Sequence, residues 1–260
     1  MSGEEKRIAL CFLVYDRIEC ENIWERWLKS HPDGDKFTLY VHSKFDFQVE
    51  SEFLKSRVNI LIDTVPTEWA DFSLVEATHR LFMAAISNPQ NYKCVLLSNT
   101  CIPVKPPNYV WKFLTDDNIS YIFESRKSER FPRYLLLRRF VPVSKISKHS
   151  QWIILNRAHI QLINEHFSVI KKLYDGIRMS DESWALTFLQ ICNLESEINT
   201  FYQTTYTNWI ENDVPQHPKL YKTLDEKEVK KFVEGEYLFA RKFENNPKIN
   251  EMLLTIFAAA

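Results

Sequence analysis

The chain has 260 residues, enough for one large domain or two small ones with a sizeable hydrophobic core. A hydrophobic share of 45% and a charged share of 26% are ordinary for a soluble globular protein, and 33 basic against 34 acidic residues give a formal net charge of -1. This balance excludes a surface that is basic throughout, as in many proteins that bind nucleic acid or anionic membranes. Any site for a polyanion must therefore be local.

Cysteine usage and the N-terminal sequence bear on the class of protein. The five cysteines form no CxxC pair and lie in apolar stretches, which favours reduced and mostly buried thiols. The polar opening "MSGEEKR" precedes an apolar run, residues 8–15, that is too short to span a bilayer or to serve as a signal anchor. We therefore expect no membrane segment in this chain.

Apolar runs alternate with helical patterns along the first 125 residues, which is typical of a sheet whose strands are joined by crossover helices. The predicted strands are residues 7–16, 36–43, 58–63, 92–99 and 120–125. The predicted helices are residues 19–30, and residues 71–88 with Ser73 as the N-cap. This order predicts a nucleotide-binding layout, with ligands beyond the carboxyl ends of the strands.

The second half of the chain is less regular. We see no repeat, low-complexity tract or linker, and we therefore expect one domain, with a nucleotide-binding half at 1–125 and an acceptor-binding and catalytic half at 126–260. The predicted elements of the second half are a strand at 150–157, a long helix at 158–175, a charged helix at 225–235 and a strand at 237–243.

Common motifs for phosphate or metal binding are missing. With four glycines and neither GxGxxG nor GxxxxGK[ST], the sequence excludes a P-loop and ordinary dinucleotide binding. The histidines show no metal-binding spacing. Asp33, Gly34 and Asp35 spell a carboxylate pair that could hold a divalent cation, but they lie in a Pro-Gly turn, where the turn alone explains these residues. We expect no metal site.

Two acids open the stretch "SDESWALTFL", residues 180–189. Ser180 is a good N-cap, and Asp181 and Glu182 in the first turn of a helix would be stabilised by its dipole by about 0.3–1 kcal/mol. The same field keeps a carboxylate ionised, as a general base must be. Capping and proton abstraction both remain open on these residues alone.

The stretch "YLFARKF", residues 237–243, carries two adjacent cations on a predicted strand. Alternation directs Lys242 to one side and Arg241 to the other, so at least one of them faces an apolar surface. A surface lysine that extends its ammonium to water explains the pattern, and so does a cation that binds a diphosphate.

Six segments in one order resemble the core-2/I-branching N-acetylglucosaminyltransferase family, glycosyltransferase family 14, which also contains xylosyltransferases. The match runs from about residue 8 to 245, and its spelling is similar to the plant-like branch. The segments are residues 73–104, "HSQWIILNR", "SDESWALTFL", "TYTNW", "HPKLY" and "YLFARKF".

This resemblance implies a GT-A type fold, a Rossmann-like mixed α/β sheet flanked by helices, and an inverting transfer from a UDP-sugar without a metal or other cofactor. Glu182 matches the family's general base, and Lys242, with Arg241 beside it, matches a diphosphate contact. Lys222 best fits a second cation, with Lys219 as the competitor. Xylose and N-acetylglucosamine both remain possible as the transferred sugar, and the acceptor is an oligosaccharide or a glycoprotein.

Further contacts follow from the topology and from the resemblance. The donor candidates lie at the first two strand ends: Val14, Tyr15, Asp16, His42 and Ser43. The acceptor candidates, each of which core packing or a surface ion pair would equally explain, are Glu124, Arg133, Trp152, Tyr206 and Trp209.

Two other functions compete with this hypothesis. One is a catalytically idle relative that binds a sugar or a nucleotide. The other is a nucleic-acid-binding module built on residues 126–140, where six basic residues and one acid are interleaved with aromatic residues; the neutral total charge disfavours it, and we expect no nucleic-acid partner. We expect a soluble cytoplasmic enzyme, microbial or viral, with the catalytic domain of a Golgi enzyme as the alternative.

Overall fold

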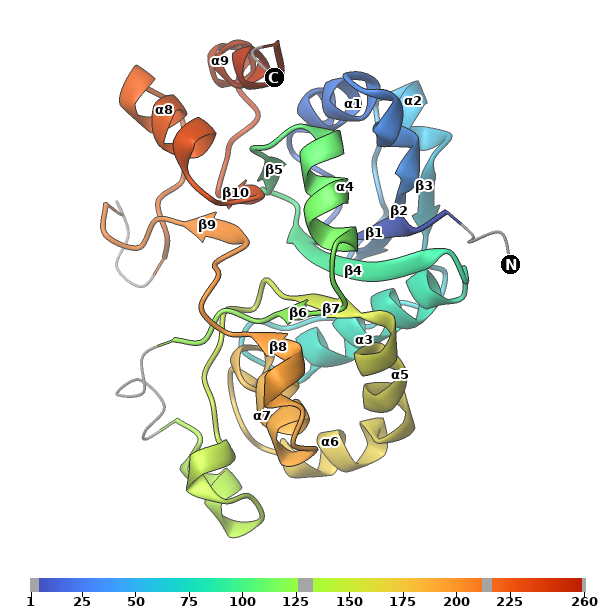
Figure 1. Ribbon diagram of the computed structural model, residues 1–260, viewed down its shortest axis with the longest axis vertical. Helices are drawn as coiled ribbons and strands as arrows, with labels where there is room; N and C mark the ends of the chain where they lie inside the picture. The colour runs from blue at the N-terminus through green and yellow to red at the C-terminus, as the bar shows by residue number, and fades with distance from the viewer. Residues whose placement is uncertain (1–4, 126–132, 212–216, 259–260) are drawn as a thin grey trace.

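The computed structural model describes residues 5–125, 133–211 and 217–258 (Figure 1). Within these residues the central sheet has seven strands in the order β3-β2-β1-β4-β7-β6-β8. The strands are β1 (Arg7–Val14), β2 (Phe37–Ser43), β3 (Val58–Ile60), β4 (Asn91–Ser98), β6 (Ser120–Tyr121), β7 (Ile154–Asn156) and β8 (Ile198–Asn199). Strands β1 to β4 are parallel, and β7 runs antiparallel to both β4 and β6. The mixed sheet confirms the predicted α/β class, and its 3-2-1-4 order is that of a nucleotide-binding half.

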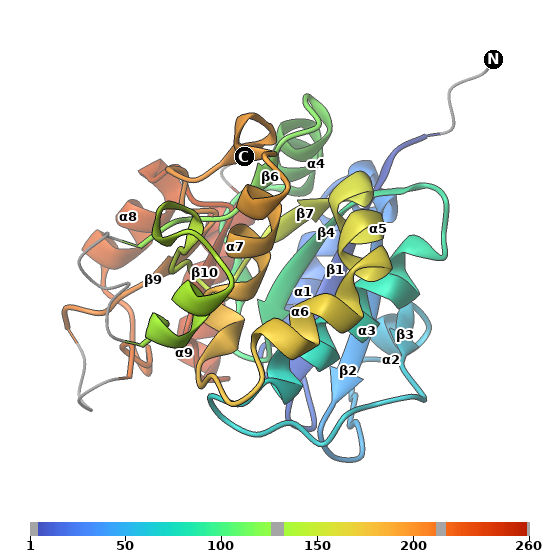
Figure 2. The ribbon, with the colours of Figure 1, turned by 90° about the horizontal axis from the view of Figure 1, so that it is seen from below.

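Helices cover both faces of this sheet (Figure 2). On one face lie α1 (Glu21–Lys29), α2 (Glu52–Lys55) and α4 (Pro107–Thr115). On the other lie α3 (Ser73–Ile86), α5 (Arg157–Glu165), α6 (Phe167–Leu173) and α7 (Trp184–Ile191). Strand β1 is buried on both faces, because Leu10 and Phe12 pack towards α1 while Ala9 and Cys11 pack towards α3. A strand buried on both faces reads as a continuous apolar run, which is why the sequence revealed it.

Helix α1 fixes the loop that follows β4. Its apolar face, which includes Trp24 and Trp27, is buried. The Trp24 indole donates to the carbonyl of Cys101 at 3.0 Å, and the Trp27 indole donates to the carbonyl of Lys105 at 2.6 Å. These bonds hold the loop at the carboxyl end of β4 in place.

A second, three-stranded sheet brings the end of the chain to the same loop (Figure 1). Its order is β5 (Ile102–Pro103), β10 (Phe239–Arg241) and β9 (Thr205–Thr207). Helices α8 (Glu226–Glu234) and α9 (Pro247–Ala258) cover it. The amide of Phe243 donates to the carbonyl of Thr100 at 3.0 Å, so residues 237–243 lie beside the carboxyl end of β4. Helices α4 and α9 were not predicted.

Several predicted boundaries and the predicted cap at Ser73 were wrong. Ser73 is the first residue of α3 and not its cap: its hydroxyl accepts from the amide of Glu68 at 2.9 Å, while the Asp71 carboxylate accepts from the amide of Ser73 at 2.8 Å. The predicted helix at 158–175 is divided at His166 into α5 and α6.

No helix in the described part of the chain has the length and apolarity needed to cross a bilayer.

Candidate active site

The carboxyl ends of three parallel strands meet at one edge of the central sheet. Val14 of β1 pairs with Ser43 of β2, and Leu13 pairs with Ser98 of β4. The first two donor segments predicted from the sequence are therefore neighbours. Ligands of open α/β sheets bind at this edge.

The loops after β1 and β2 are joined by their main chains. The carbonyls of Val14, Tyr15 and Asp16 accept from the amides of the β2 loop at 3.1, 2.8 and 2.7 Å; the donors are Lys44, Phe45 and Gln48. The Tyr15 side chain is 59% exposed, and the Asp16 carboxylate pairs with Arg17 at 3.2 Å. Tyr15 thus presents an accessible ring, while the charge of Asp16 is already partnered.

His42 is buried and has a structural contact. Its Nε2 accepts from the amide of Val65 at 2.9 Å, and burial lowers the pKa of the imidazole. The neutral ring therefore holds the loop that follows β3. Ser43, which is also buried, follows it at the end of the strand.

Arg241 and Lys242 form a pair of adjacent cations next to this edge. The Arg241 side chain is buried against the face of Trp152, with 4.2 Å between the guanidinium carbon and the ring centroid, and burial lowers its pKa to about 10. Burial, and then the neighbouring guanidinium, lower the pKa of Lys242. Among the residues that the structure describes, none forms an ion pair or hydrogen bond with the Lys242 ammonium. A desolvated pair of cations of this kind is suited to an anionic ligand.

The two lysines after the "HP" segment lie in different surroundings. The Lys219 ammonium binds the carboxylates of Glu228 at 2.7 Å and Glu211 at 3.2 Å, and these bonds raise its pKa. Lys222 is exposed and forms no ion pair with a described residue. The charge of Lys219 is therefore already engaged, whereas that of Lys222 is available.

A main-chain bridge also connects the segment of Lys222 to that of Lys242. A parallel bridge joins Tyr221 to Phe243, and these two rings stack with their centroids 4.9 Å apart. Lys222 follows Tyr221 and Lys242 precedes Phe243, so this bridge brings the two lysine-bearing segments side by side. Lys222 remains a prediction for the second cation.

The two acids at 181 and 182 lie in a short 3-10 helix, η5 (Ser180–Glu182), and α7 begins only at Trp184. The predicted N-cap at Ser180 is wrong, because its buried hydroxyl has no hydrogen-bond partner among the described residues. Met179, the residue before it, has a left-handed φ of 55°. Burial, and then the charge of Glu182, raise the pKa of Asp181 to about 7. Asp181 is thus a buried acid and not an exposed first-turn carboxylate.

Glu182 is accessible and held by two cations. Its side chain is 25% exposed, and its Oε2 lies 3.0 Å from Arg133 Nη1 and 3.7 Å from Lys148 Nζ. Its carbonyl accepts from the amide of His149 at 2.7 Å. The predicted base and the predicted acceptor residue Arg133 are therefore in direct contact.

One extended segment, residues 148–152, links the acid to the cation pair. At its start, Lys148 and His149 contact Glu182, and at its end the Trp152 ring covers the Arg241 guanidinium. Lys148 was not predicted as a site residue. The sequence does carry one signal for it, because no Asp or Glu occurs between Glu129 and Glu165, so the basic residues there lack local partners.

The remaining acceptor candidates divide between the site and the core. Glu124 forms a bridge with His149, and its Oε1 accepts from the Ser147 hydroxyl at 2.7 Å, which places it beside the Glu182 segment. Tyr206 packs in the core under α8, where its hydroxyl accepts from Lys231. Trp209 is 54% exposed on the loop after β9.

The predicted turn at residues 33–35 is a 3-10 helix, η1 (Pro32–Lys36). Asp33 pairs with Lys36 at 2.9 Å and Asp35 with Arg57 at 2.8 Å. A Cβ on Gly34 would lie 1.8 Å from the carbonyl oxygen of Leu28, so close packing requires the glycine.

In the basic stretch proposed for nucleic acid, residues 126–132 lie outside the described residues, and Arg133 pairs with Glu182.

A family model and a plant protein are similar to this chain. The family model of the core-2/I-branching enzyme matches residues 8–233. Glycosyltransferase BC10 of rice (Oryza sativa subsp. japonica) is 26% identical over 181 residues, which are 66% of this chain and 44% of the rice protein. The chain therefore spans less than half the length of that relative.

Two solved glycosyltransferase structures align with most of this chain at low sequence identity. The galactosyltransferase LgtC in complex with donor and acceptor sugar analogues gives a TM-score of 0.47 at 8% identity, with 97% of this chain and 96% of that chain covered. Mouse xyloside xylosyltransferase 1 gives 0.42 at 9%, with 90% and 97% covered. The family match, which covers most of the chain, assigns the protein: it belongs to the core-2/I-branching enzyme family.

Proposed function

We propose that the chain is an inverting glycosyltransferase that moves a sugar from a UDP-sugar to a hydroxyl of an oligosaccharide or glycoprotein acceptor. The observation that carries this proposal is the segment 148–152. An accessible glutamate, Glu182, lies at one end of it, and the cation pair of Arg241 and Lys242 lies at the other. A single displacement needs a base for the acceptor and a positive site for the leaving group. The family match and the name of the rice relative support this proposal.

In this mechanism the Glu182 carboxylate takes the proton from the acceptor hydroxyl while that oxygen attacks the anomeric carbon from the face opposite UDP. The bond from the anomeric carbon to the β-phosphate oxygen breaks, and UDP leaves with that electron pair. Lys242, with Arg241 beside it and Lys222 from the segment bridged to Phe243, would neutralise the negative charge that grows on the phosphate. Arg133 and Lys148 would orient the Glu182 carboxylate.

We propose that this transfer needs no divalent cation. The carboxylates closest to such a role are already engaged, because Asp16 pairs with Arg17, and Asp33 and Asp35 pair with basic residues. Lys242 adds a positive charge that has no ion pair with a described residue, next to the loop that follows β4. A fixed ammonium can stabilise a leaving diphosphate as a metal does in other enzymes.

The test is UDP release from UDP-xylose and from UDP-N-acetylglucosamine, each with a pool of neutral oligosaccharide acceptors and excess EDTA. We expect release from one of the two donors, and a loss of about 10²- to 10⁴-fold in Glu182→Gln with UDP binding retained. Glu165→Gln, at an exposed glutamate in α5, is the matched control and should behave as the unmodified chain.

Three results would contradict the proposal in different ways. Equal turnover by Glu182→Gln and the unmodified chain would remove Glu182 as the base. UDP binding without release from either donor would favour an idle nucleotide-binding relative. Recovery of activity only when Mg²⁺ or Mn²⁺ is restored would contradict metal independence alone.

A further inference from the structure

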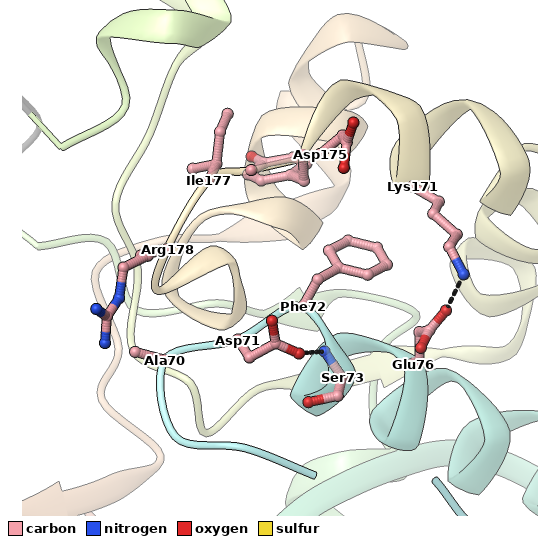
Figure 3. A pocket seen from close by; sticks show the side chains of 11 residues that line it. Ala70, Asp71, Phe72, Ser73, Glu76, Lys171, Asp175, Ile177 and Arg178 are labelled. Carbon is pink, nitrogen blue, oxygen red and sulfur yellow. Dashed lines mark hydrogen bonds and ion pairs between the residues drawn. The ribbon is translucent and has the colours of Figure 1, made fainter. Parts of the chain in front are cut away.

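A cavity of about 270 Å³ lies between the start of α3 and the loop that follows α6 (Figure 3). Asp71 and Phe72 line it from the first side, and Asp175 and Arg178 line it from the second. The loop that carries Arg178 continues directly into η5, which carries Glu182. The cavity lining thus ends two residues before η5 in the chain.

Two charged side chains that line this cavity are without an ion pair to the described chain. Neither Asp175 nor Arg178 forms an ion pair with a described residue. The Arg178 guanidinium carbon lies 5.9 Å from the centroid of the Trp69 ring, and this ring is 65% exposed. Asp71 uses Oδ1 to accept from the Ser73 amide. The Asp175 carboxylate and the Arg178 guanidinium are thus available to a ligand, and the Trp69 ring lies beside Arg178.

The backbone around the cavity adopts uncommon conformations. Ala70 and Met179 have left-handed φ values of 63° and 55°, and the amide of Met179 donates to the carbonyl of Ala70 at 2.7 Å. Gly176 on the same loop has a φ of 68°. Non-glycine residues hold this conformation only where the surrounding structure enforces it, which is common at binding sites. The Ala70–Met179 bond ties the cavity wall to the residue that precedes η5.

Charge and size restrict the ligand. Glu76 and Lys171 neutralise each other at the far end of the cavity, and Asp71 and Asp175 exceed Arg178 by one negative charge. This excess disfavours a phosphate or another anion. The volume is slightly below the range of about 300–1,000 Å³ for pockets that hold drug-sized molecules, so the cavity suits a single ring.

We propose that this cavity binds one neutral pyranose unit of the acceptor glycan, an inference that rests on the proposed transferase function. Carboxylates accept hydrogen bonds from sugar hydroxyls, and a guanidinium donates to them. The exposed Trp69 ring lies next to the lining residue Arg178 and would contact the C–H groups of a sugar that extends beyond the cavity. A sugar held here sets which acceptor hydroxyl reaches Glu182, so the cavity determines acceptor specificity.

The direct test is saturation-transfer NMR on the complete chain with the methyl β-glycosides of glucose, galactose, xylose and N-acetylglucosamine. We expect transfer to at least one glycoside. It should be weakened about tenfold or more in Asp175→Asn, which loses a hydrogen bond to a charged group, and also weakened in Trp69→Ala, which loses an aromatic face. Asp116→Asn, at an exposed aspartate after α4, is the matched control. No transfer to any of the four, or transfer that persists in both variants, overturns the proposal.

A second measurement separates this inference from the transferase itself. The UDP-release assay compares Asp175→Asn with the unmodified chain on monosaccharide and disaccharide acceptors. We expect an increase of about tenfold in KM for the disaccharide, with the KM for the donor unchanged. An unchanged disaccharide KM in an active enzyme overturns the acceptor subsite and leaves the transferase intact. Glycoside binding that depends on Asp175 in a chain without transferase activity overturns the proposed function and leaves a sugar site.

Discussion

Asp181 and Glu182 are consecutive residues in η5, but their carboxyl groups lie in opposite environments. Asp181 is 8% exposed, and its Oδ1 has no partner among the described residues. Glu182 is 25% exposed and lies 3.0 Å from Arg133. The short 3-10 turn directs one acid into the core and the other to the surface, so only Glu182 is available to an acceptor.

Asp181→Asn should change the pH dependence of stability. Because an unfolded aspartate has a pKa of about 3.9 and the folded value is about 7, the folded chain binds more protons at Asp181 between these values. The stabilisation from this group is present below pH 4 and is lost as the pH rises through 7. We expect the Tm of Asp181→Asn relative to the unmodified chain to rise by about 2 °C or more between pH 5 and pH 8. A Tm difference that is constant over this range would contradict the burial of an ionisable Asp181.

Lys148→Met should lower kcat, because it removes one of the two cations that hold the Glu182 carboxylate. We expect a loss of about tenfold in kcat with little change in the KM for the donor, measured by UDP release at saturating acceptor. Lys55→Met, which removes an exposed lysine paired with Glu52, is the control. If the donor KM changes and kcat does not, Lys148 acts on the nucleotide and not on the base.

Lys242→Met should weaken UDP binding by about 10- to 100-fold, as for loss of a hydrogen bond to a charged group. The half-buried ammonium of Lys242 has no carboxylate partner among the described residues, so its charge is free for a diphosphate. Calorimetric titration with UDP measures the change. Lys219→Met, which removes an ammonium already bound to Glu228, should leave UDP affinity within about twofold of the unmodified chain. The reverse order of the two effects would assign the diphosphate contact to Lys219.

Gly34→Ala should destabilise the fold, whereas the neighbouring carboxylates should not be needed for activity. The added Cβ would meet the Leu28 carbonyl oxygen at 1.8 Å, so the chain between α1 and β2 must shift, and we expect a loss of about 2 kcal/mol or more in the free energy of unfolding. Denaturant titration measures this loss.

Asp33→Asn and Asp35→Asn should retain UDP release in EDTA, and a loss that Mn²⁺ restores would indicate a metal site instead.

The sequence by itself determined the elements whose residues share a local periodicity. The apolar run of β1, the face of α1 with Trp24 and Trp27, and the order of the family segments were all readable, because each depends on neighbours along the chain. The cap at Ser180 was misjudged for the same reason. A local pattern does not show that Met179 adopts a left-handed φ.

Only the tertiary structure decided which side chains meet. Lys148 reaches Glu182 because the turn of η5 packs against the segment 148–152, and Arg241 is buried because Trp152 covers it. Tyr206 was predicted to contact the acceptor, but its ring packs under α8. Such contacts join segments that are far apart in the chain, and packing of the two sheets brings them together. Periodicity along a single segment carries no information about them.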